Sequence, residues 1–190
     1  MPYLANAGTL LLEVGFGLLG LLFLLRLLLQ WVAAPFHNPI CQFVYRLSNP
    51  VLSPLRTLLK PWWRIDLAAG FALFAVMLVK AALLLMLWGK SLAPLAVLVL
   101  ALAETLELVL TLYFWLLVVH VVLSWVQSRS GHPAALLVTR LVAPALRPVR
   151  RILPVLAGLD LSPMLLILAI MLARILLVAP LQELALVLAR

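Results

Sequence analysis

The chain has 190 residues, of which 67% are hydrophobic and only 11% are charged, and its formal net charge is +8. This composition excludes a soluble globular domain, in which about a quarter of the residues are charged. It predicts an all-α, polytopic membrane protein. We do not expect the positive charge to bind nucleic acid, because no recognition fold accompanies it.

Four apolar stretches are each long enough to cross a hydrocarbon core, which takes about 20 helical residues. In chain order they cover approximately residues 8–34, 67–88, 92–126 and 161–188. The third stretch is too long for one upright span, so we expect its first part to tilt, to lie in the interface or to extend outside the bilayer.

The connections between paired spans, residues 37–66 and 127–160, carry apolar residues at helical spacing. Pro50 in the first and Pro144 in the second are expected to break each connection into short amphipathic helices. Such helices cannot span, but they can lie along the membrane surface with leucines toward lipid. The alternative is that these segments are only linkers, although linkers rarely repeat prolines and arginines in register.

The two halves of the chain align under a shift of 94 residues without a gap. Leucine matches mean little in so apolar a chain, so matched charges and prolines carry the inference of a duplicated unit. We therefore predict two repeats, residues 1–91 and 92–190, with two spans in each. The matched residues include Glu13 with Glu107, Arg46 with Arg140, Pro50 with Pro144, Pro54 with Pro148, Arg56 with Arg150, Asp66 with Asp160 and Lys80 with Arg174.

Each repeat crosses the membrane twice, so the second repeat must enter in the same direction as the first. This predicts a parallel repeat of two hairpins with a pseudo-two-fold axis along the membrane normal. Both long connections then lie on one side, which the positive-inside rule assigns to the cytoplasm, with both termini outside. Their basic residues are Arg46, Arg56, Lys60, Arg64, Arg129, Arg140, Arg147, Arg150 and Arg151.

Charged residues inside the predicted spans are the sharpest functional clue, because an unpaired ion at the bilayer centre is costly. Glu13 and Lys80 are expected at similar depths, so we predict that they pair, and that Glu107 pairs with Arg174 in the second repeat. Two interpretations remain open: these pairs staple helices together, or they line a polar path.

Asp66 and Asp160 each end a connection and precede a span. A carboxylate at this position can cap the first helical turn, and we expect Arg56 and Arg150 to lie near their respective aspartates. The structural interpretation is a staple between loop and helix. The functional interpretation makes each proline-arginine-aspartate element a docking surface for a cytoplasmic partner or a lipid headgroup.

Motifs for catalysis, cofactors or metals are missing from the sequence, and we expect no enzymatic activity. His120 and Ser124 share a helix face without a third residue to orient them, and Cys41 is the only cysteine. The histidines lack metal-ligand spacing. Because Arg26 occupies the position equivalent to His120, this position requires a basic group, expected to snorkel or to hydrogen bond to a carbonyl.

The repeated element resembles the signature of the YggT family of small bacterial and plastid membrane proteins. In the first repeat it reads Pro39-x6-Arg46-Leu47-x2-Pro50-x-Leu52-x-Pro54-x-Arg56, with Asp66 beyond it. In the second repeat it ends with Gly158-x-Asp160-x-Ser162-Pro163, where the first repeat has Ala68 and Ala69 in place of Ser-Pro. The resemblance implies a bacterial inner membrane protein. It also implies roles linked to osmotic-shock tolerance, to cell division and nucleoid distribution, or to assembly of haem-containing cytochrome complexes.

Two classes of function follow from the sequence. In the favoured class, the protein is a non-catalytic adaptor or assembly factor whose basic connections bind a protein partner or anionic lipid. In the alternative, the charged pairs line a potassium or proton path between the hairpins. We expect an anionic bilayer and a protein of unknown identity as partners, and homo-oligomerisation stays open.

Overall fold

The computed structural model describes residues 2–59, 63, 65–126, 132–152 and 160–190. All of its main elements are helices, in agreement with the predicted fold class. In chain order they are α1 (Pro2–Trp31), α2 (Pro39–Leu58), α3 (Leu67–Leu87), α4 (Pro94–Val126), α5 (Pro133–Ile152), α6 (Ser162–Ala173), the π-helix η1 (Arg174–Val178) and α7 (Ala179–Leu188).

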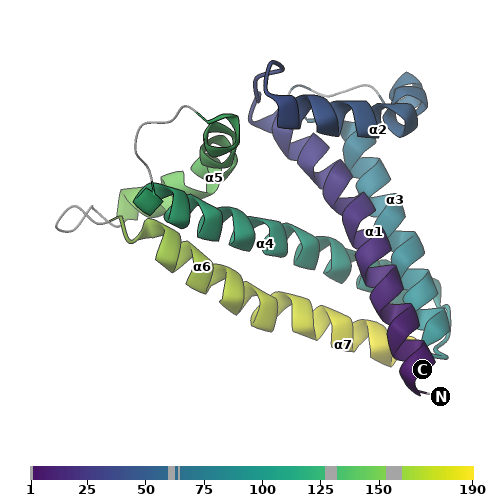
Figure 1. Ribbon diagram of the computed structural model, residues 1–190. Coiled ribbons are helices and arrows are strands. Elements are labelled where there is room, and N and C mark those ends of the chain that lie inside the picture. The colour runs from purple at the N-terminus through teal and green to yellow at the C-terminus, as the bar shows by residue number, and fades with distance from the viewer. Residues whose placement is uncertain (1, 60–62, 64, 127–131, 153–159) are drawn as a thin grey trace.

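The long helices form two hairpins, one from α1 and α3 and the other from α4 and the continuous run of α6, η1 and α7 (Figure 1). The hairpins meet near the two chain ends and diverge toward α2 and α5, which both lie at the other side of the molecule. This arrangement confirms the predicted pair of same-direction hairpins.

Four segments in the described chain are long and apolar enough to cross a membrane: Asn6–Trp31, Leu67–Leu87, Pro94–Ser124 and Ser162–Leu188. They match the four predicted spans closely. The third is part of the unbroken 33-residue helix α4. At 1.5 Å per residue, α4 is about 50 Å long, so it must tilt or extend beyond a hydrocarbon core of about 30 Å.

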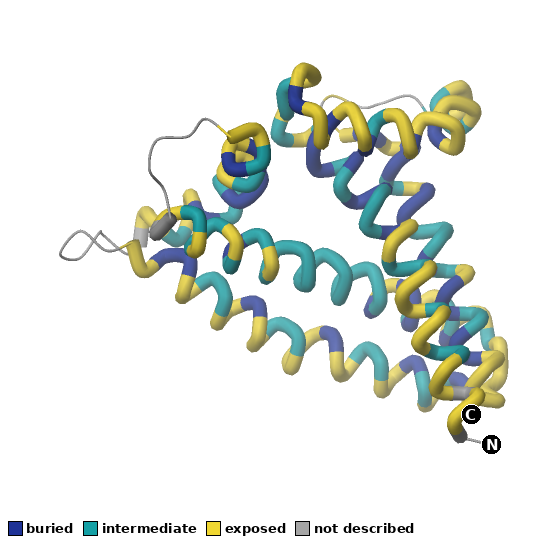
Figure 2. Tube along the Cα trace, viewed as in Figure 1, coloured by how far each residue is buried: buried dark blue, intermediate teal, exposed yellow. Residues whose placement is uncertain are grey.

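Burial is concentrated where α1 packs on α3 and where α3 meets α4, whereas outward positions are exposed (Figure 2). A buried cluster crosses from one repeat to the other, with Met77 and Leu84 from α3, Leu100 from α4 and Ala185 from α7. Gly20 lets α1 approach closely, because a Cβ atom there would collide with Met77. The two repeats therefore share one apolar core.

The predicted break at Pro50 is wrong, because α2 runs unbroken through both Pro50 and Pro54. Each proline removes one N–H, and this leaves the carbonyls of Arg46 and Pro50 without their helical donors. Both of these residues are exposed, so the free carbonyls can be solvated and the helix continues. The break predicted at Pro144 is also wrong, since α5 contains Pro144 and Pro148 without interruption. Its freed carbonyls belong to the exposed Arg140 and the partly exposed Pro144.

The two connections contact each other at the starts of their helices. Pro39 and Pro133 are the first residues of α2 and α5. Asn38 caps α2 by accepting a hydrogen bond from the N–H of Ile40 at 2.9 Å. Its Nδ2 donates to the carbonyl oxygen of Pro133 at 2.8 Å. The N-terminal ends of α2 and α5 thus meet between the hairpins.

Candidate functional site

Most of the charged residues of the spans, though not Arg26 and Glu183, line one pocket between the hairpins, with a volume of about 610 Å³. Residues from α1, α3, α4, η1 and α7 line it, so both repeats contribute. The polar members of the lining are Glu13, Lys80, Glu104, Glu107, Thr111, Arg174 and Gln182. The structure therefore brings all four sequence-predicted intramembrane charges to one place.

The predicted pair between Glu13 and Lys80 is not the one formed. The Lys80 ammonium pairs with Glu104, which lies on α4 in the other repeat. Both of these side chains are largely buried. Within the described part of the chain, Glu13 forms no ion pair, although it lines the same pocket. Although α3 packs on both α1 and α4, its contact with α4 places the Glu104 carboxylate beside Lys80.

The second-repeat pair is present, with Arg174 Nη2 lying 3.2 Å from Glu107 Oε1. Arg174 also donates to the Thr111 hydroxyl at 2.6 Å, and Thr111 donates to Glu107 at 3.1 Å. The guanidinium carbon is 5.7 Å from the centroid of the Phe114 ring. These contacts hold the Arg174 side chain against α4, which belongs to the same repeat.

Sequence reasoning missed Glu104 and Gln182. Gln182 Nε2 donates to Glu104 Oε1 at 3.5 Å, so this carboxylate has partners on two helices. A signal for Glu104 was available, because Glu104, Glu107 and Thr111 follow helical i, i+3, i+7 spacing and share a face. Glu104 was overlooked because its equivalent in the first repeat is Leu10, so it breaks the repeat pattern.

Arg174 is the first residue of the π-helix η1. A π segment widens one helical turn, and such segments are frequent at functional sites. Here the widened turn lies in the wall of the pocket, between Arg174 and Gln182. The equivalent helix of the first repeat, α3, is α-helical throughout.

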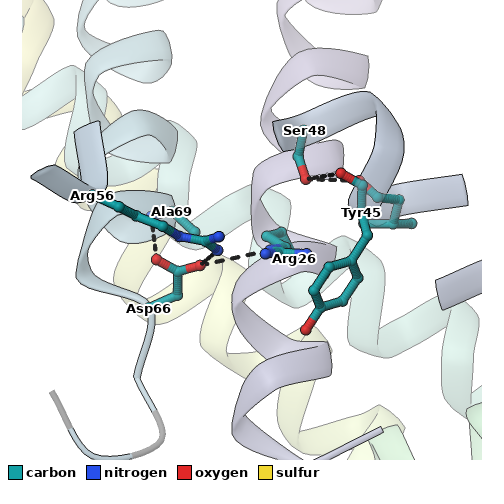
Figure 3. A network of polar contacts seen from close by, with 7 residues as sticks. Arg26, Tyr45, Ser48, Arg56, Asp66 and Ala69 are labelled. Atoms are coloured by element: carbon teal, nitrogen blue, oxygen red, sulfur yellow. Dashed lines mark hydrogen bonds and ion pairs between the residues drawn. The ribbon is translucent and has the colours of Figure 1, made fainter. Parts of the chain in front are cut away.

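The second polar centre lies where α1, α2 and α3 meet (Figure 3). Asp66 is fully buried and caps α3 by accepting from the N–H of Ala69 at 3.2 Å. Arg56 donates to the same carboxylate, as the sequence suggested. The Asp66 carboxylate therefore connects the end of α2 to the start of α3.

Arg26 also belongs to this centre, which corrects the expectation that it snorkels or bonds to a carbonyl. It is 2% exposed, and its Nε lies 3.6 Å from Asp66 Oδ2. Its guanidinium carbon stacks 3.2 Å from the centroid of the Tyr45 ring. Neither partner was predicted, because Arg26 is 19 residues from Tyr45 and 40 from Asp66, and no local pattern links them.

The second repeat has a simpler version of this centre. Arg150 Nη2 lies 2.7 Å from Asp160 Oδ2, and Asp160 Oδ1 accepts from the N–H of Ser162 at 3.0 Å. Although burial acts to raise the pKa of Asp160, hydrogen bonds from Ser162 and Arg150 hold it below its ordinary value. The pair is partly exposed, and the buried Ser162 and Pro163 begin α6.

The other predicted motif residues lie on the outer surfaces of the connections. Arg46, Arg140, Arg147 and Arg151 are exposed. Arg140 donates to the carbonyl of Ala33 at 3.4 Å, which joins α5 to the end of α1. The predicted basic residues Lys60, Arg64 and Arg129 lie outside the described residues.

Little in the described residues suggests catalysis or metal binding. No group of three or more histidine, cysteine or acidic residues there could hold a metal ion. Cys41 is buried on α2, and burial raises the pKa of its thiol, so the less nucleophilic form is favoured. The absence of enzymatic activity stays a prediction.

Comparison with known proteins then settles the family. The CCB3/YggT family model matches the chain twice, over residues 5–87 and 99–181. The chain belongs to the CCB3/YggT family. These two matches place all charged residues of the pocket, in both repeats, within family-matched sequence, whereas Gln182 lies just beyond the second match.

Two relatives each align with more than four-fifths of the chain. "Uncharacterized protein YggT" of Escherichia coli K12 is 34% identical over 170 residues, which is 86% of this chain and 85% of the relative. "Uncharacterized protein PA0392" of Pseudomonas aeruginosa is 37% identical over 160 residues, or 83% of this chain and 81% of the relative. No solved structure matches. The two tandem family matches show an internal repeat, and the four apolar helices are consistent with a multi-pass membrane protein. The names of the relatives assign no activity.

Proposed function

We propose that this protein is a non-catalytic adaptor or assembly factor of the bacterial inner membrane. In this proposal the side that carries α2 and α5 faces the cytoplasm, and both chain ends lie outside. The positive-inside rule supports this orientation, because the exposed arginines of the connections are on the α2 and α5 side.

The observation that carries the proposal is the basic face of α5. Arg140, Arg147 and Arg151 follow i, i+7, i+11 spacing and are all exposed, while Leu141 and Leu146 on other faces of α5 are buried. Arg150 and Arg56, by contrast, are occupied by Asp160 and Asp66. The docking surface is therefore the row Arg140, Arg147 and Arg151, rather than the arginines of the aspartate pairs.

A concave feature continues this basic face toward the first repeat. A pocket of about 390 Å³ lies between the end of α1 and α5, lined by Trp31, Arg140, Pro144 and Arg147 among others. An arginine-lined hollow beside an exposed tryptophan is suited to an acidic segment of a protein partner or to anionic headgroups.

The exposed apolar stripe of α2 supports its position in the membrane interface. Ile40, Phe43, Leu47, Val51 and Leu58 are exposed at helical spacing, although the buried face of α2 is formed by other residues. A helix with an apolar stripe on lipid and Arg46 on another face lies flat at the boundary of the bilayer. The α2 helix would then anchor the platform while α5 presents the docking surface.

Crosslinking in intact cells tests the adaptor proposal. A photoreactive residue in place of Ala143, which lines the α5 pocket, should capture a specific neighbour, and this capture should be lost in Arg147→Glu/Arg151→Glu. The matched control is Lys90→Glu/Arg190→Glu, which changes two exposed basic residues elsewhere in the chain. The proposal fails if no specific neighbour is captured, or if both double variants behave alike. Growth after osmotic downshift in strains with these variants would then test the physiological link.

A second candidate function, a potassium or proton path, is favoured by the intramembrane pocket. Its three carboxylates, one ammonium and one guanidinium give a formal charge of −1, and Glu13 is the carboxylate without an ion pair in the described chain. Purified protein in vesicles should then carry a potassium or proton flux. That flux should be lost in Glu13→Gln and Lys80→Leu, and retained in Glu183→Gln, which changes an exposed glutamate outside the pocket. Absence of flux in the unaltered protein would exclude the path.

A further inference from the structure

The polar centre of the first repeat has more positive than negative charge. Two guanidiniums, from Arg26 and Arg56, converge on the single carboxylate of Asp66. Arg26 and Asp66 are both buried, so water compensates the extra charge poorly. This centre would be balanced by one further anion.

Arg26 also has hydrogen-bond donors without acceptors. Its Nη1 atom is buried and donates to no described protein group, and its buried Nε faces Asp66 Oδ2 at 3.6 Å, which is too long for a hydrogen bond. The Asp66 oxygens already accept from Arg56 and from the N–H of Ala69. Because Tyr45 stacks on the face of the guanidinium, the N–H groups in its plane stay available. Buried donors without acceptors cost free energy, so these N–H groups indicate a binding site for a ligand that supplies hydrogen-bond acceptors.

A pocket of about 510 Å³ opens beside these two arginines. Its lining contains both guanidiniums and no carboxylate, together with aromatic and amide side chains. Besides Arg26 and Arg56, the larger side chains of the lining are Gln30, Phe36, Tyr45 and Trp63. Its chemistry is that of an anion site with an aromatic wall.

This pocket lies near the end of a spanning helix, where the headgroup region of a bilayer is expected. Arg26 is five residues before Trp31, at which α1 ends, and thus about 7.5 Å from that end along the helix axis. Exposed apolar side chains of α1, including Trp31, are next to this region. A ligand with a phosphate and acyl chains could place the phosphate on the arginines and the chains along α1.

The second repeat lacks this arrangement. The positions of Arg26 and Tyr45 are taken there by His120 and Thr139, and Asp160 has the single partner Arg150 among described ion pairs. The Arg150–Asp160 pair is also more exposed than the Arg56–Asp66 pair, so water can hydrogen bond to its remaining donors and acceptors. At the Arg150–Asp160 centre, the described buried atom without a hydrogen-bond partner is the hydroxyl oxygen of Ser162, and no second guanidinium forms an ion pair there. The excess of positive charge and the buried guanidinium donors therefore distinguish the first-repeat centre from its counterpart.

We propose that Arg26 and Arg56 bind the phosphate group of an anionic phospholipid in the pocket formed by α1, α2 and the turn between them. The phosphate oxygens supply the acceptors that Arg26 lacks, and the negative charge of the phosphate neutralises the extra positive charge of the two guanidiniums. This inference deepens the lipid arm of the adaptor proposal, but it uses a different surface from the α5 basic face.

Native mass spectrometry of the delipidated full-length protein in detergent tests the site. Titrations would use short-chain phosphatidylglycerol, the zwitterionic phosphatidylcholine and inorganic phosphate as separate probes. We expect one tight phosphatidylglycerol site, weakened about tenfold in Arg26→Gln and in Arg56→Gln, since each substitution removes a charge-assisted hydrogen bond. The matched controls His120→Gln and Arg150→Gln change the equivalent positions of the second repeat and should bind as the unaltered protein does.

Each other outcome contradicts the proposal. Equal weakening in Arg150→Gln would mean that surface charge alone attracts the lipid. Tight inorganic phosphate binding that excludes lipid would assign the site to a soluble anion, and equal affinity for phosphatidylcholine would deny anion selectivity. Arg26 is buried, so circular dichroism must first show that the Arg26→Gln variant is folded. If that variant does not fold, the lipid affinity of Arg56→Gln, which changes a partly exposed residue, decides the test. The Arg147→Glu/Arg151→Glu variant should retain phosphatidylglycerol in this pocket, so failure of the adaptor and failure of the lipid site are distinguishable.

Discussion

The two arginine-aspartate centres carry the same residues at the same spacing, yet they have different surroundings. In the first repeat, Asp66 is fully buried and is shared by Arg56 and Arg26. In the second, Asp160 and Arg150 are about one-third and one-half exposed and pair with each other. Burial and a third charged residue thus convert a surface staple into an internal network. We therefore expect the duplicated residues to contribute different amounts to the free energy of unfolding in the two repeats.

The largest difference between the two centres is expected on removal of the carboxylate. Asp66→Asn leaves two guanidiniums facing each other in a buried site, and we expect a loss of roughly 3–5 kcal/mol in unfolding free energy. Asp160→Asn should cost less than about 1 kcal/mol, because water screens an exposed pair. Chemical denaturation in detergent micelles measures both. Arg26→Met/Asp66→Asn should recover part of the loss, and equal costs for the two single variants would contradict the comparison.

The two intramembrane ion pairs should also differ, because one connects the repeats and the other lies within a repeat. Lys80→Met leaves Glu104 charged and largely buried, so we expect a loss of about 3 kcal/mol. Removing both partners in Lys80→Met/Glu104→Leu should restore most of it. Arg174→Met should cost less, since the Arg174 side chain is about one-third exposed. A double-mutant cycle that gives no coupling between Lys80 and Glu104 would show that the pair does not form.

The N-terminal ends of the two connection helices should show a smaller difference. Asn38→Ala removes the cap of α2 and the hydrogen bond to Pro133, with an expected cost of roughly 1 kcal/mol. His132 occupies the equivalent position before α5, and its Nδ1 accepts from Ala134 N–H at a longer 3.3 Å in an exposed setting. His132→Ala should therefore be nearly neutral in the same denaturation assay. A greater cost for His132→Ala would reverse this ranking.

The smallest expected effect is the pH dependence of the Asp160 centre. Its pKa is lowered in the folded state, so the stabilisation is present above the ordinary aspartate pKa of about 4 and is lost as the pH falls through the folded value. The stability difference between the unaltered protein and Asp160→Asn should therefore shrink below about pH 4. Melting curves of both proteins from neutral to acidic pH measure this difference. A difference that grows on acidification would indicate the opposite sign.

Much of the fold could be predicted because it depends on local and repeating patterns. Apolar length gave the four spans, and matched charges gave the repeat and the direction of the hairpins. The contacts of Asp66 and Asp160 with the following helix were also predictable, since each aspartate is close in sequence to that helix. Asp66 caps α3, and Asp160 accepts from the N–H of Ser162, the first residue of α6. The continuity of α2 through Pro50 could not be predicted, because it depends on whether the carbonyls that lose their helical donors are solvated.

The candidate sites were predicted less well because they depend on packing between repeats. Repeat symmetry predicted Glu13 as the partner of Lys80, but the contact of α3 with α4 selected Glu104, which has no acidic counterpart in the first repeat. Symmetry likewise treated Arg26 and His120 alike, although only Arg26 has a stacked tyrosine. An aligned pair of residues predicts a shared position, but the neighbours at that position decide its role.

The ion pair between Lys80 and Glu104 has a consequence for the separate halves of the chain. Leu10 occupies the position in the first repeat that matches Glu104, so the second repeat supplies the acidic partner of Lys80. The first repeat expressed alone would carry Lys80 without this partner, and the second repeat alone would carry Glu104 without its lysine. An unpaired charge inside the membrane is costly, so the two halves depend on each other for charge compensation.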